Sequence, residues 1–193
     1  AAGPDSVRGS RARLLRDAGY ATQLVGKWHC GDQPPFLPTR HGFDGYYGLP
    51  YSNDMGRNRD GYGGTPPLPL MWDEGILQEQ PDQASLTERY VAESVRFMRA
   101  NRERPFFLYL AYTAPHTPRQ AKHEYRNRFR HLKDEPNRLY AGMVASLDEN
   151  IGRVLDKLAE SKLEQNTLVA FVSDNGPARG ADYLSGWRKE WPE

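Results

Sequence analysis

Two short, continuous apolar runs constrain the fold of this chain more than any other feature. They are FFLYLAY at residues 106–112 and TLVAFV at residues 167–172. Apolar runs of this length are typical of strands that are buried on both faces of a parallel sheet. Segments with helical spacing precede them, at residues 85–102 and 137–161. Helices that alternate with buried strands predict an α/β fold, with a largely parallel central sheet flanked by helices.

A further helix and strand are predicted near the start of the chain. Residues 10–18 have the pattern of a short basic helix that ends at Gly19, and residues 20–26 have that of a strand. In the helix at residues 85–102, Ser85 is the expected N-cap and Glu88 completes a capping box. The apolar stripes of the three predicted helices are Leu14, Leu15 and Ala18; Leu86, Tyr90, Val91, Val95, Phe97 and Met98; and Leu139, Met143, Leu147, Ile151, Val154, Leu155 and Leu158.

The segment from residue 30 to residue 84 lacks such patterns and is predicted to be rich in loops. The chain has 18 glycines and 15 prolines, many of them in this segment. A long irregular stretch within a compact domain is usually either functional or disordered. Its many aromatic side chains favour an ordered, functional insertion: Phe36, Phe43, Tyr46, Tyr47, Tyr51 and Tyr62.

Charge and composition exclude several classes of protein. The 26 Lys and Arg residues nearly balance the 25 Asp and Glu residues, which argues against a nucleic-acid-binding protein. No apolar run approaches the roughly 18 residues of a transmembrane helix, and the first 15 residues do not resemble a signal peptide. Cys30 is the single cysteine, so no internal disulfide can form, and we expect it to pack in the interior. The length of 193 residues suits one domain or one large part of a domain.

Polar residues suited to chemistry follow each of the three predicted strands. They are Lys27 and His29, then His116, then Asp174 with Asn175. The carboxyl ends of parallel strands meet at one edge of a sheet, which is where α/β proteins place their sites. The sequence therefore predicts a site at this edge.

The first and last of these groups suit an anionic ester and a hard metal ion. In an extended segment Lys27 and His29 share a face, where an ammonium can offset charge and an imidazole can move a proton. Asp174 and Asn175 offer the oxygen ligands that Ca²⁺ or Mg²⁺ prefers, although two donors do not complete a site. The alternatives are a surface lysine beside a packed histidine, and an Asx turn that closes a strand.

Two loops add weaker candidates. His116 lies between Pro115 and Pro118, which restrict its backbone, but it also fits a structural loop histidine. Ser52 lies in the YSND loop at residues 51–54, which also fits an ordinary Ser or Asx turn. Two further histidines, His123 and His131, lie in a basic stretch and are expected to be solvated.

Taken together, these segments resemble the sulfatase family, of arylsulfatase type, in the alkaline phosphatase superfamily. The resemblance rests on five blocks in the order of that family. They are LLRDAGYATQLVGKWH (residues 14–29), PTRHGFD with YGLPYSND (38–54), PFFLYLAYTAPHTP (105–118), YAGMVASLDENIGR (140–153) and VSDNGP (172–177). Each block alone is weakly specific, whereas the ordered set spans nearly the whole chain. The resemblance implies an alkaline-phosphatase-like α/β fold and hydrolysis of sulfuric esters.

The resemblance also implies roles for individual residues. Asp174 and Asn175 would bind a divalent metal, usually Ca²⁺. Lys27 would contact the sulfate group and help to hold the nucleophile, and His29 would assist breakdown of the covalent intermediate. His116 would lie near the leaving oxygen as a possible general acid, and Ser52 would supply a hydroxyl to the substrate.

The family nucleophile is not among these blocks. It is a formylglycine made from the Cys or Ser of a C/S-x-P-x-R motif upstream of GKWH, and no such motif occurs here. The paired aspartates that complete the family metal site do not occur either, and Lys189 lies in a context unlike the family's downstream lysine. We expect residues 1–193 to be the central part of one catalytic domain, lacking both ends and inactive in isolation.

Substrate and reaction stay open at this point. A small aryl sulfate or a carbohydrate sulfate would fit, and the family implies a secreted, periplasmic or lysosomal protein. A phosphate or phosphonate ester hydrolase of the same superfamily would need a similar site. A non-catalytic fragment or binding module is the alternative outside the enzymes.

Overall fold

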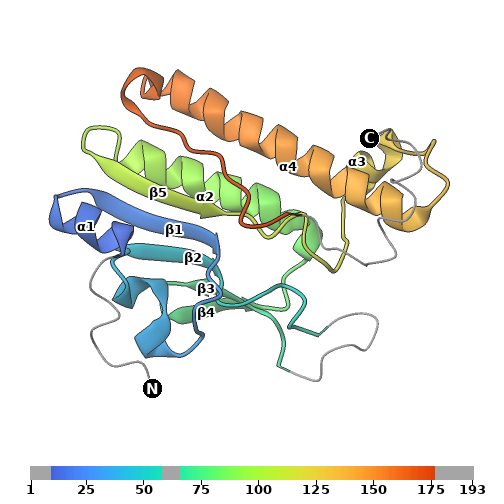
Figure 1. The fold of residues 1–193 in the computed structure, drawn as a ribbon, viewed down its shortest axis with the longest axis horizontal. Helices are drawn as coiled ribbons and strands as arrows, with labels where there is room; N and C mark the ends of the chain where they lie inside the picture. Colours follow the sequence, from blue (N-terminus) through green and yellow to red (C-terminus); the bar gives the residue numbers. More distant parts are fainter. Residues whose placement is uncertain (1–9, 58–65, 177–193) are drawn as a thin grey trace.

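The computed structural model describes residues 10–57 and 66–176, and it contains a mixed five-stranded sheet in the order β4-β3-β2-β1-β5 (Figure 1). The α/β class is therefore confirmed. Strands β1, β2 and β5 are parallel, while β3 and β4 continue the sheet as an antiparallel hairpin. The elements are α1 (Arg11–Asp17), β1 (Ala21–Lys27), η2 (Pro34–Phe36), η3 (Pro38–Arg40), β2 (Gly45–Leu49), β3 (Pro69–Trp72), β4 (Gly75–Glu79), η4 (Gln83–Ser85), α2 (Leu86–Ala100), β5 (Phe106–Ala111), α3 (His123–Arg128), α4 (Glu135–Glu160) and η5 (Glu164–Asn166).

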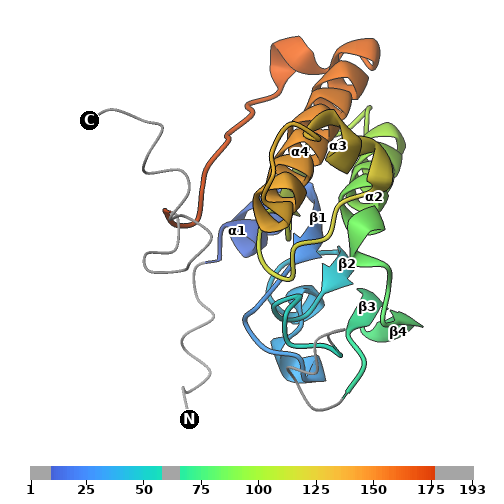
Figure 2. The same ribbon diagram turned by 90° about the vertical axis from the view of Figure 1, so that its right-hand side faces the viewer.

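Side chains of β1 and β2 alternate between two buried clusters, one on each face of the sheet. Val25 and Tyr47 point to the face that α2 covers with Leu86 and Tyr90. The residues before them point to the opposite face, where α1 and the segment after β1 cover them; this second cluster comprises Ala12, Leu24, Leu37, Phe43, Tyr46 and Met71. Helix α4 packs on α2, on the side away from the strands (Figures 1 and 2).

Two glycines allow the parallel strands to approach closely at their carboxyl ends. Gly26 has φ +113°, and a Cβ there would lie 1.8 Å from the carbonyl oxygen of Ala111. A Cβ on Gly48 would lie 1.8 Å from the carbonyl oxygen of Gly26. Because no side chain fits between these backbones, the loops that leave β1, β2 and β5 begin close together.

The segment from residue 30 to residue 84 is less irregular than its sequence indicates. It contains β2, β3 and β4, so three of the five strands lie in it. Strand β2 is buried, but its sequence GYYGL includes two glycines and no run of aliphatic residues. Strand β4 is exposed along its whole length. No buried face therefore imposes an alternating apolar pattern on its sequence.

The prediction of a buried strand at residues 167–172 is wrong for this structure. The segment is extended but unpaired, and the side chains of Leu168 and Phe171 are 95% and 79% exposed. The neighbouring prediction of full burial for β5 is also wrong. Tyr109 is 47% exposed and the other residues of β5 are only partly buried. Among the described residues β5 pairs only with β1 and forms an edge of the sheet.

The three helices are confirmed, but two of their details differ from prediction. Ser85 does not cap α2; its hydroxyl donates to the carbonyl of Asp82, whose own carboxylate caps η4. The carboxylate of Glu88 pairs instead with Lys122. In α1 the buried residue is Ala12, while Leu14 of the predicted apolar stripe is 63% exposed.

In the described part of the chain, no helix combines the length and the apolar character needed to cross a membrane.

Candidate functional site

The carboxyl ends of β1, β2 and β5 place three loops at one edge of the sheet. Lys27 pairs in register with Leu49, and Gly26 pairs with Ala111. The ladder between β1 and β2 continues past both strands, since the amides of Trp28 and His29 donate to the carbonyls of Leu49 and Pro50, each at 3.0 Å. The segment with Lys27 and His29 therefore lies directly beside the loop that carries Ser52.

His29 leaves the extended conformation that the sequence pattern assumes. Its φ is +60°, a left-handed value that costs energy for a residue with a side chain. The inference that Lys27 and His29 share a face of an extended strand therefore does not hold at His29. Trp28 between them is half-buried, with its indole NH donating to the carbonyl of Phe36 at 2.7 Å and its ring edge-on to Phe43. The indole anchors the turn, and His29 itself is exposed.

Ser52 is the most buried of the predicted site residues, with 4% of its surface exposed. Its carbonyl accepts the amide of Met55 at 3.0 Å in a tight turn. Its hydroxyl is buried and has no hydrogen-bond partner within residues 10–57 and 66–176. Buried hydroxyls are nearly always satisfied, so an unpaired one in a loop at the site edge is suited to an external acceptor or donor.

His116 lies at the third strand end and is exposed. Its amide donates to the carbonyl of Thr113 at 3.0 Å, and its Nδ1 lies 2.8 Å from the carbonyl oxygen of Thr117. A carbonyl can only accept, so this contact is a hydrogen bond when Nδ1 carries the proton. In that state Nε2 is the nitrogen left for a substrate, as an acceptor when the ring is neutral and as a donor when it is charged.

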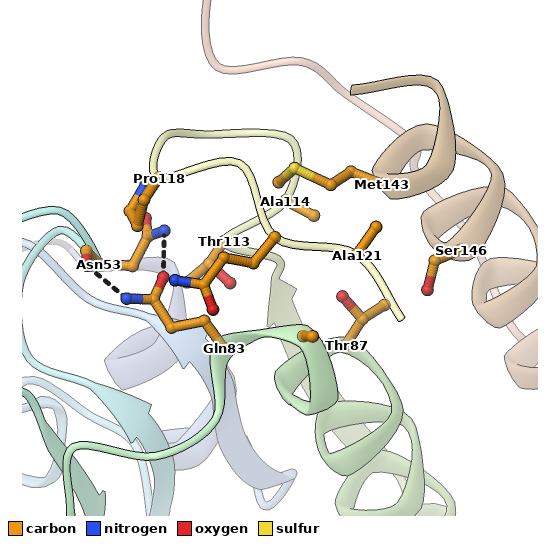
Figure 3. Close-up of a pocket in the computed structure, with 11 residues that line it drawn as sticks. Asn53, Gln83, Thr87, Thr113, Ala114, Pro118, Ala121, Met143 and Ser146 are labelled. Carbon is orange, nitrogen blue, oxygen red and sulfur yellow. Dashed lines mark hydrogen bonds between the residues drawn. The ribbon is translucent and has the colours of Figure 1, made fainter. Parts of the chain in front are cut away.

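A small cavity shows that the loops after β2 and β5 pack against each other (Figure 3). Asn53 contributes from the first loop and Thr113 and Pro118 from the second, while α2 and α4 close the other sides with Thr87 and Ser146. The volume of about 20 Å³ has room for one water molecule, which excludes a sugar ring. The cavity therefore belongs to the support of the site and not to its substrate pocket.

Asp174 and Asn175 are not brought into contact with the other candidates. Both are exposed at the end of the unpaired segment, where the Ser173 hydroxyl donates to the carbonyl of Asn175 at 2.6 Å. Within residues 10–57 and 66–176, no three His, Cys, Asp or Glu side chains gather as a metal site would require. Their oxygens fit Ca²⁺ in kind and supply part of a coordination shell. Lys189 lies outside the described residues.

Comparison with known proteins decides the family. The sequence model described as Sulfatase matches residues 10–193. The chain belongs to the sulfatase family. It is 35% identical over 172 residues to N-acetylgalactosamine-6-sulfatase of Homo sapiens, covering 86% of this chain and 32% of that protein. It is 30% identical over 191 residues to arylsulfatase G of Rattus norvegicus, covering 86% of this chain and 35% of that protein. The chain thus spans about a third of the length of these relatives.

Solved structures, among them a protein described as a sulfatase, share its fold. The chain is 31% identical to Ps i-CgsB, solved in complex with k-i-k-neocarrahexaose, with a TM-score of 0.68 over 83% of this chain and 40% of that chain. The PsFucS1 sulfatase from Pseudoalteromonas sp. has 22% identity and a TM-score of 0.66 over 86% of this chain and 37% of that chain. These likenesses confirm the expected alkaline-phosphatase-like fold.

Some residues around the candidate site differ from expectation or were missed by the sequence reasoning, while others agree with it. Cys30 is exposed, because it follows the turn at His29 and not a buried strand. His123 and His131 are exposed, as predicted. Gln80 and Gln83 were not singled out, yet both bind the loop of Ser52. Glutamines before a helix carry no signal of such a role in the sequence.

Burial holds the tyrosines near the site in their neutral form. It raises the pKa of Tyr112 well above its usual value, and it also raises the pKa of Tyr90. The pKa of Tyr51, next to Ser52, is raised by burial and by the negative charge of Asp32. These phenols are therefore protonated at neutral pH and unsuited to act as bases.

Proposed function

We propose that the full-length protein containing this chain is a sulfatase that hydrolyses sulfuric esters at the edge formed by β1, β2 and β5. One observation supports this most: in a member of the sulfatase family, the Lys27–His29 segment is bonded to the loop that carries the buried, unpaired hydroxyl of Ser52. An ammonium, a hydroxyl and two imidazoles suit the tetrahedral, negatively charged sulfate group of such an ester.

Lys27 attracts and holds the sulfate group. It ends β1 and is half-buried, and within residues 10–57 and 66–176 no carboxylate forms an ion pair with it. A cation that is partly removed from water and has no protein counterion is available to an anionic substrate. The Ser52 hydroxyl can donate a further hydrogen bond to a sulfate oxygen.

The two histidines move protons. With Nδ1 bonded to the carbonyl of Thr117, the charged ring of His116 can donate the Nε2 proton to the ester oxygen as the bond from sulfur to that oxygen breaks. His29, on the neighbouring loop, accepts a proton during release of sulfate. A formylglycine, expected from an upstream C/S-x-P-x-R motif, would supply the oxygen that attacks sulfur.

Asp174 and Asn175 would hold a divalent cation, and Ca²⁺ fits their hard oxygens. The cation would offset charge on the sulfate oxygens. Further ligands would have to come from outside the described residues, since no suitable cluster lies within them.

We take a carbohydrate sulfate as the natural substrate. The support is the name N-acetylgalactosamine-6-sulfatase among the relatives and the neocarrahexaose complex among the related structures. A small aryl sulfate serves as a convenient assay substrate. The family also supports a secreted, periplasmic or lysosomal location, and nothing in the balanced charge of the chain favours a nucleic acid as partner.

The experiment compares sulfate and phosphate esters of the same alcohol. Full-length protein, matured with a formylglycine-generating enzyme and supplied with Ca²⁺, is assayed on 4-nitrophenyl sulfate and 4-nitrophenyl phosphate. The proposal expects kcat/KM to be higher for the sulfate ester. A higher kcat/KM for the phosphate ester would show instead a phosphatase of the same superfamily, and turnover of neither ester would favour a non-catalytic protein.

A further inference from the structure

Gln83 binds the loop of Ser52 through both ends of its side-chain amide. The Ser52 loop is defined here as residues 50–57. The Gln83 amide nitrogen donates to the backbone carbonyl of Asn53 at 3.0 Å, and its oxygen accepts from the Asn53 side chain at 2.9 Å (Figure 3). Asn53 directly follows Ser52 and is almost completely buried. The contact therefore fixes the side chain of Asn53 and the peptide unit that follows it, one residue beyond Ser52.

Gln80 binds the other end of the same loop. Its side-chain nitrogen donates to the carbonyl of Arg57 at 2.8 Å, and its oxygen accepts the amides of Arg57 at 3.2 Å and Leu68 at 3.0 Å. The backbone of Gln80 has φ +45°, a left-handed value that is costly for a residue with a side chain. This strained backbone conformation occurs at the residue whose side chain bonds Arg57 and Leu68.

The segment that carries Gln83 is held by hydrogen bonds of its own. Gln83 lies in η4, where the Asp82 carboxylate accepts the amide of Ala84 at 3.1 Å and the Ser85 hydroxyl donates to the Asp82 carbonyl at 2.7 Å. Helix α2 follows without a break. Gln83 therefore extends from a braced segment, and Gln80 follows β4, where its amide donates to the carbonyl of Leu68 at 2.7 Å. Both side chains reach a loop with no regular secondary structure.

We propose that Gln80 and Gln83 are positioning residues that clamp the Ser52 loop and so fix the Ser52 hydroxyl toward the sulfate group. This inference rests on the proposed function, because it assigns the clamp a part in binding the sulfate ester. A loop hydroxyl serves catalysis only if its direction is set before the substrate arrives. The two glutamines hold the loop after Ser52 at two points, Asn53 and Arg57. Before Ser52 the backbone is held by the amide of His29, which donates to the carbonyl of Pro50.

The test uses methionine substitutions, which retain most of the volume of glutamine but cannot accept or donate these hydrogen bonds. Gln80→Met and Gln83→Met are made in the full-length protein. Gln165→Met is the matched control, since Gln165 is an exposed glutamine in η5, away from the loop. Gln83→Glu is a second variant, which keeps an acceptor for Asn53 and loses the donor.

Hydrogen exchange reports on the loop without reference to activity. The clamp predicts that amides of residues 51–57 exchange at least about tenfold faster in Gln80→Met and Gln83→Met than in the wild type, with Gln165→Met unchanged. Gln83→Glu should be intermediate. Unchanged exchange in the first two variants would overturn the clamp.

A double-mutant cycle with Ser52→Ala then separates positioning from general support. Gln83→Met is expected to lower kcat/KM for 4-nitrophenyl sulfate by roughly tenfold, as befits the loss of two hydrogen bonds. In the Ser52→Ala background the same substitution should change kcat/KM by less than about twofold. An equal loss in both backgrounds would overturn action through Ser52. A wild type that exchanges slowly here but turns over no sulfate ester would refute the proposed function, and the assignment of the clamp to sulfate binding would fall with it.

Discussion

Gly48 and Gly26 lie so close together that a Cβ on Gly48 would lie 1.8 Å from the carbonyl oxygen of Gly26. This contact joins β1 to β2 just before the residues assigned to the sulfate group. We predict that Gly48→Ala lowers the free energy of unfolding by about 1–3 kcal/mol, because the strands must separate to admit the methyl group.

The control for this substitution is Gly152→Ala. Gly152 lies in α4 with nothing within 4 Å of its added Cβ, so alanine should raise the free energy of unfolding by about 0.5–1 kcal/mol. Urea denaturation of the full-length protein measures both values. A Gly48→Ala variant as stable as the wild type would contradict the close approach of the strands.

His116→Ala should affect substrates according to their leaving groups. A general acid contributes most when the departing alcohol is a poor leaving group, so we predict a loss in kcat of roughly 10²–10⁴ for a carbohydrate sulfate. The loss for 4-nitrophenyl sulfate should be much smaller, because nitrophenolate departs without a proton. His131→Ala, at an exposed histidine, is the matched control. Equal losses on both substrates would contradict the role of His116 as an acid.

Glu149 should make the stability of the helical layer depend on acid pH. Hydrogen bonding and charge from Arg128, with a further hydrogen bond from Tyr125, lower the pKa of Glu149 below its usual 4.5. A lowered folded pKa contributes stability that is fully present above the unfolded pKa and lost as pH falls through the folded value. We therefore predict that Glu149→Gln melts below the wild type at pH 7, and that this difference shrinks when the pH is lowered below about 4.5.

Thermal melts of both proteins across this pH range test the sign. A difference that grows toward acid pH would contradict the assignment. Glu164→Gln is a suitable control, since Glu164 is an exposed carboxylate in η5.

The unpaired segment at residues 167–172 should make the isolated polypeptide 1–193 prone to aggregate. Its apolar side chains are exposed in this structure, and the outer edge of strand β5 has no partner among the described residues. We predict that Leu168→Ser with Phe171→Ser makes the isolated polypeptide more soluble. In the full-length protein the same pair should cost about 1.5–3 kcal/mol for each side chain that becomes buried there. Sedimentation of the polypeptide and denaturation of the full-length protein give the two readings, and a soluble wild-type polypeptide with a cooperative melt would contradict the prediction.

Much of the fold follows from local pattern. The strand at Phe106–Ala111 and the helix at Glu135–Glu160 were predictable because their apolar spacing is dense and their ends are marked by proline and polar caps. Strand β2 was not, because its two glycines serve the close packing of backbones, a tertiary requirement that removes the local signal. The segment at residues 167–172 has the pattern of a buried strand, but pairing depends on partners that its own sequence does not specify.

The candidate site, like the fold, was predictable only in part from the sequence. The alternation of helices and strands predicted that Lys27 and His116 would follow strands that end at one edge, and the ends of β1 and β5 do adjoin there. The same reasoning placed Asp174 at this edge, but the segment before it is unpaired. It did not show that the Ser52 loop follows a third strand, β2, beside β1. The left-handed backbone conformation of His29 could not be predicted from its residue type. It accompanies the hydrogen bonds that continue the pairing of β1 with β2 past the end of β1. The clamp of Gln80 and Gln83 was hidden for a related reason: its hydrogen bonds join residues that are 12 to 30 positions apart.

The central claim is that this edge of the sheet binds and cleaves a sulfate ester, and Lys27 tests it most directly. The measurement is kcat/KM for 4-nitrophenyl sulfate of matured full-length protein, compared among the wild type, Lys27→Ala and the exposed-lysine control Lys133→Ala. Loss of one group that stabilises charge in the transition state predicts a fall of roughly 10²–10³ for Lys27→Ala and no change for Lys133→Ala. A Lys27→Ala variant that keeps wild-type activity would contradict the site proposed here.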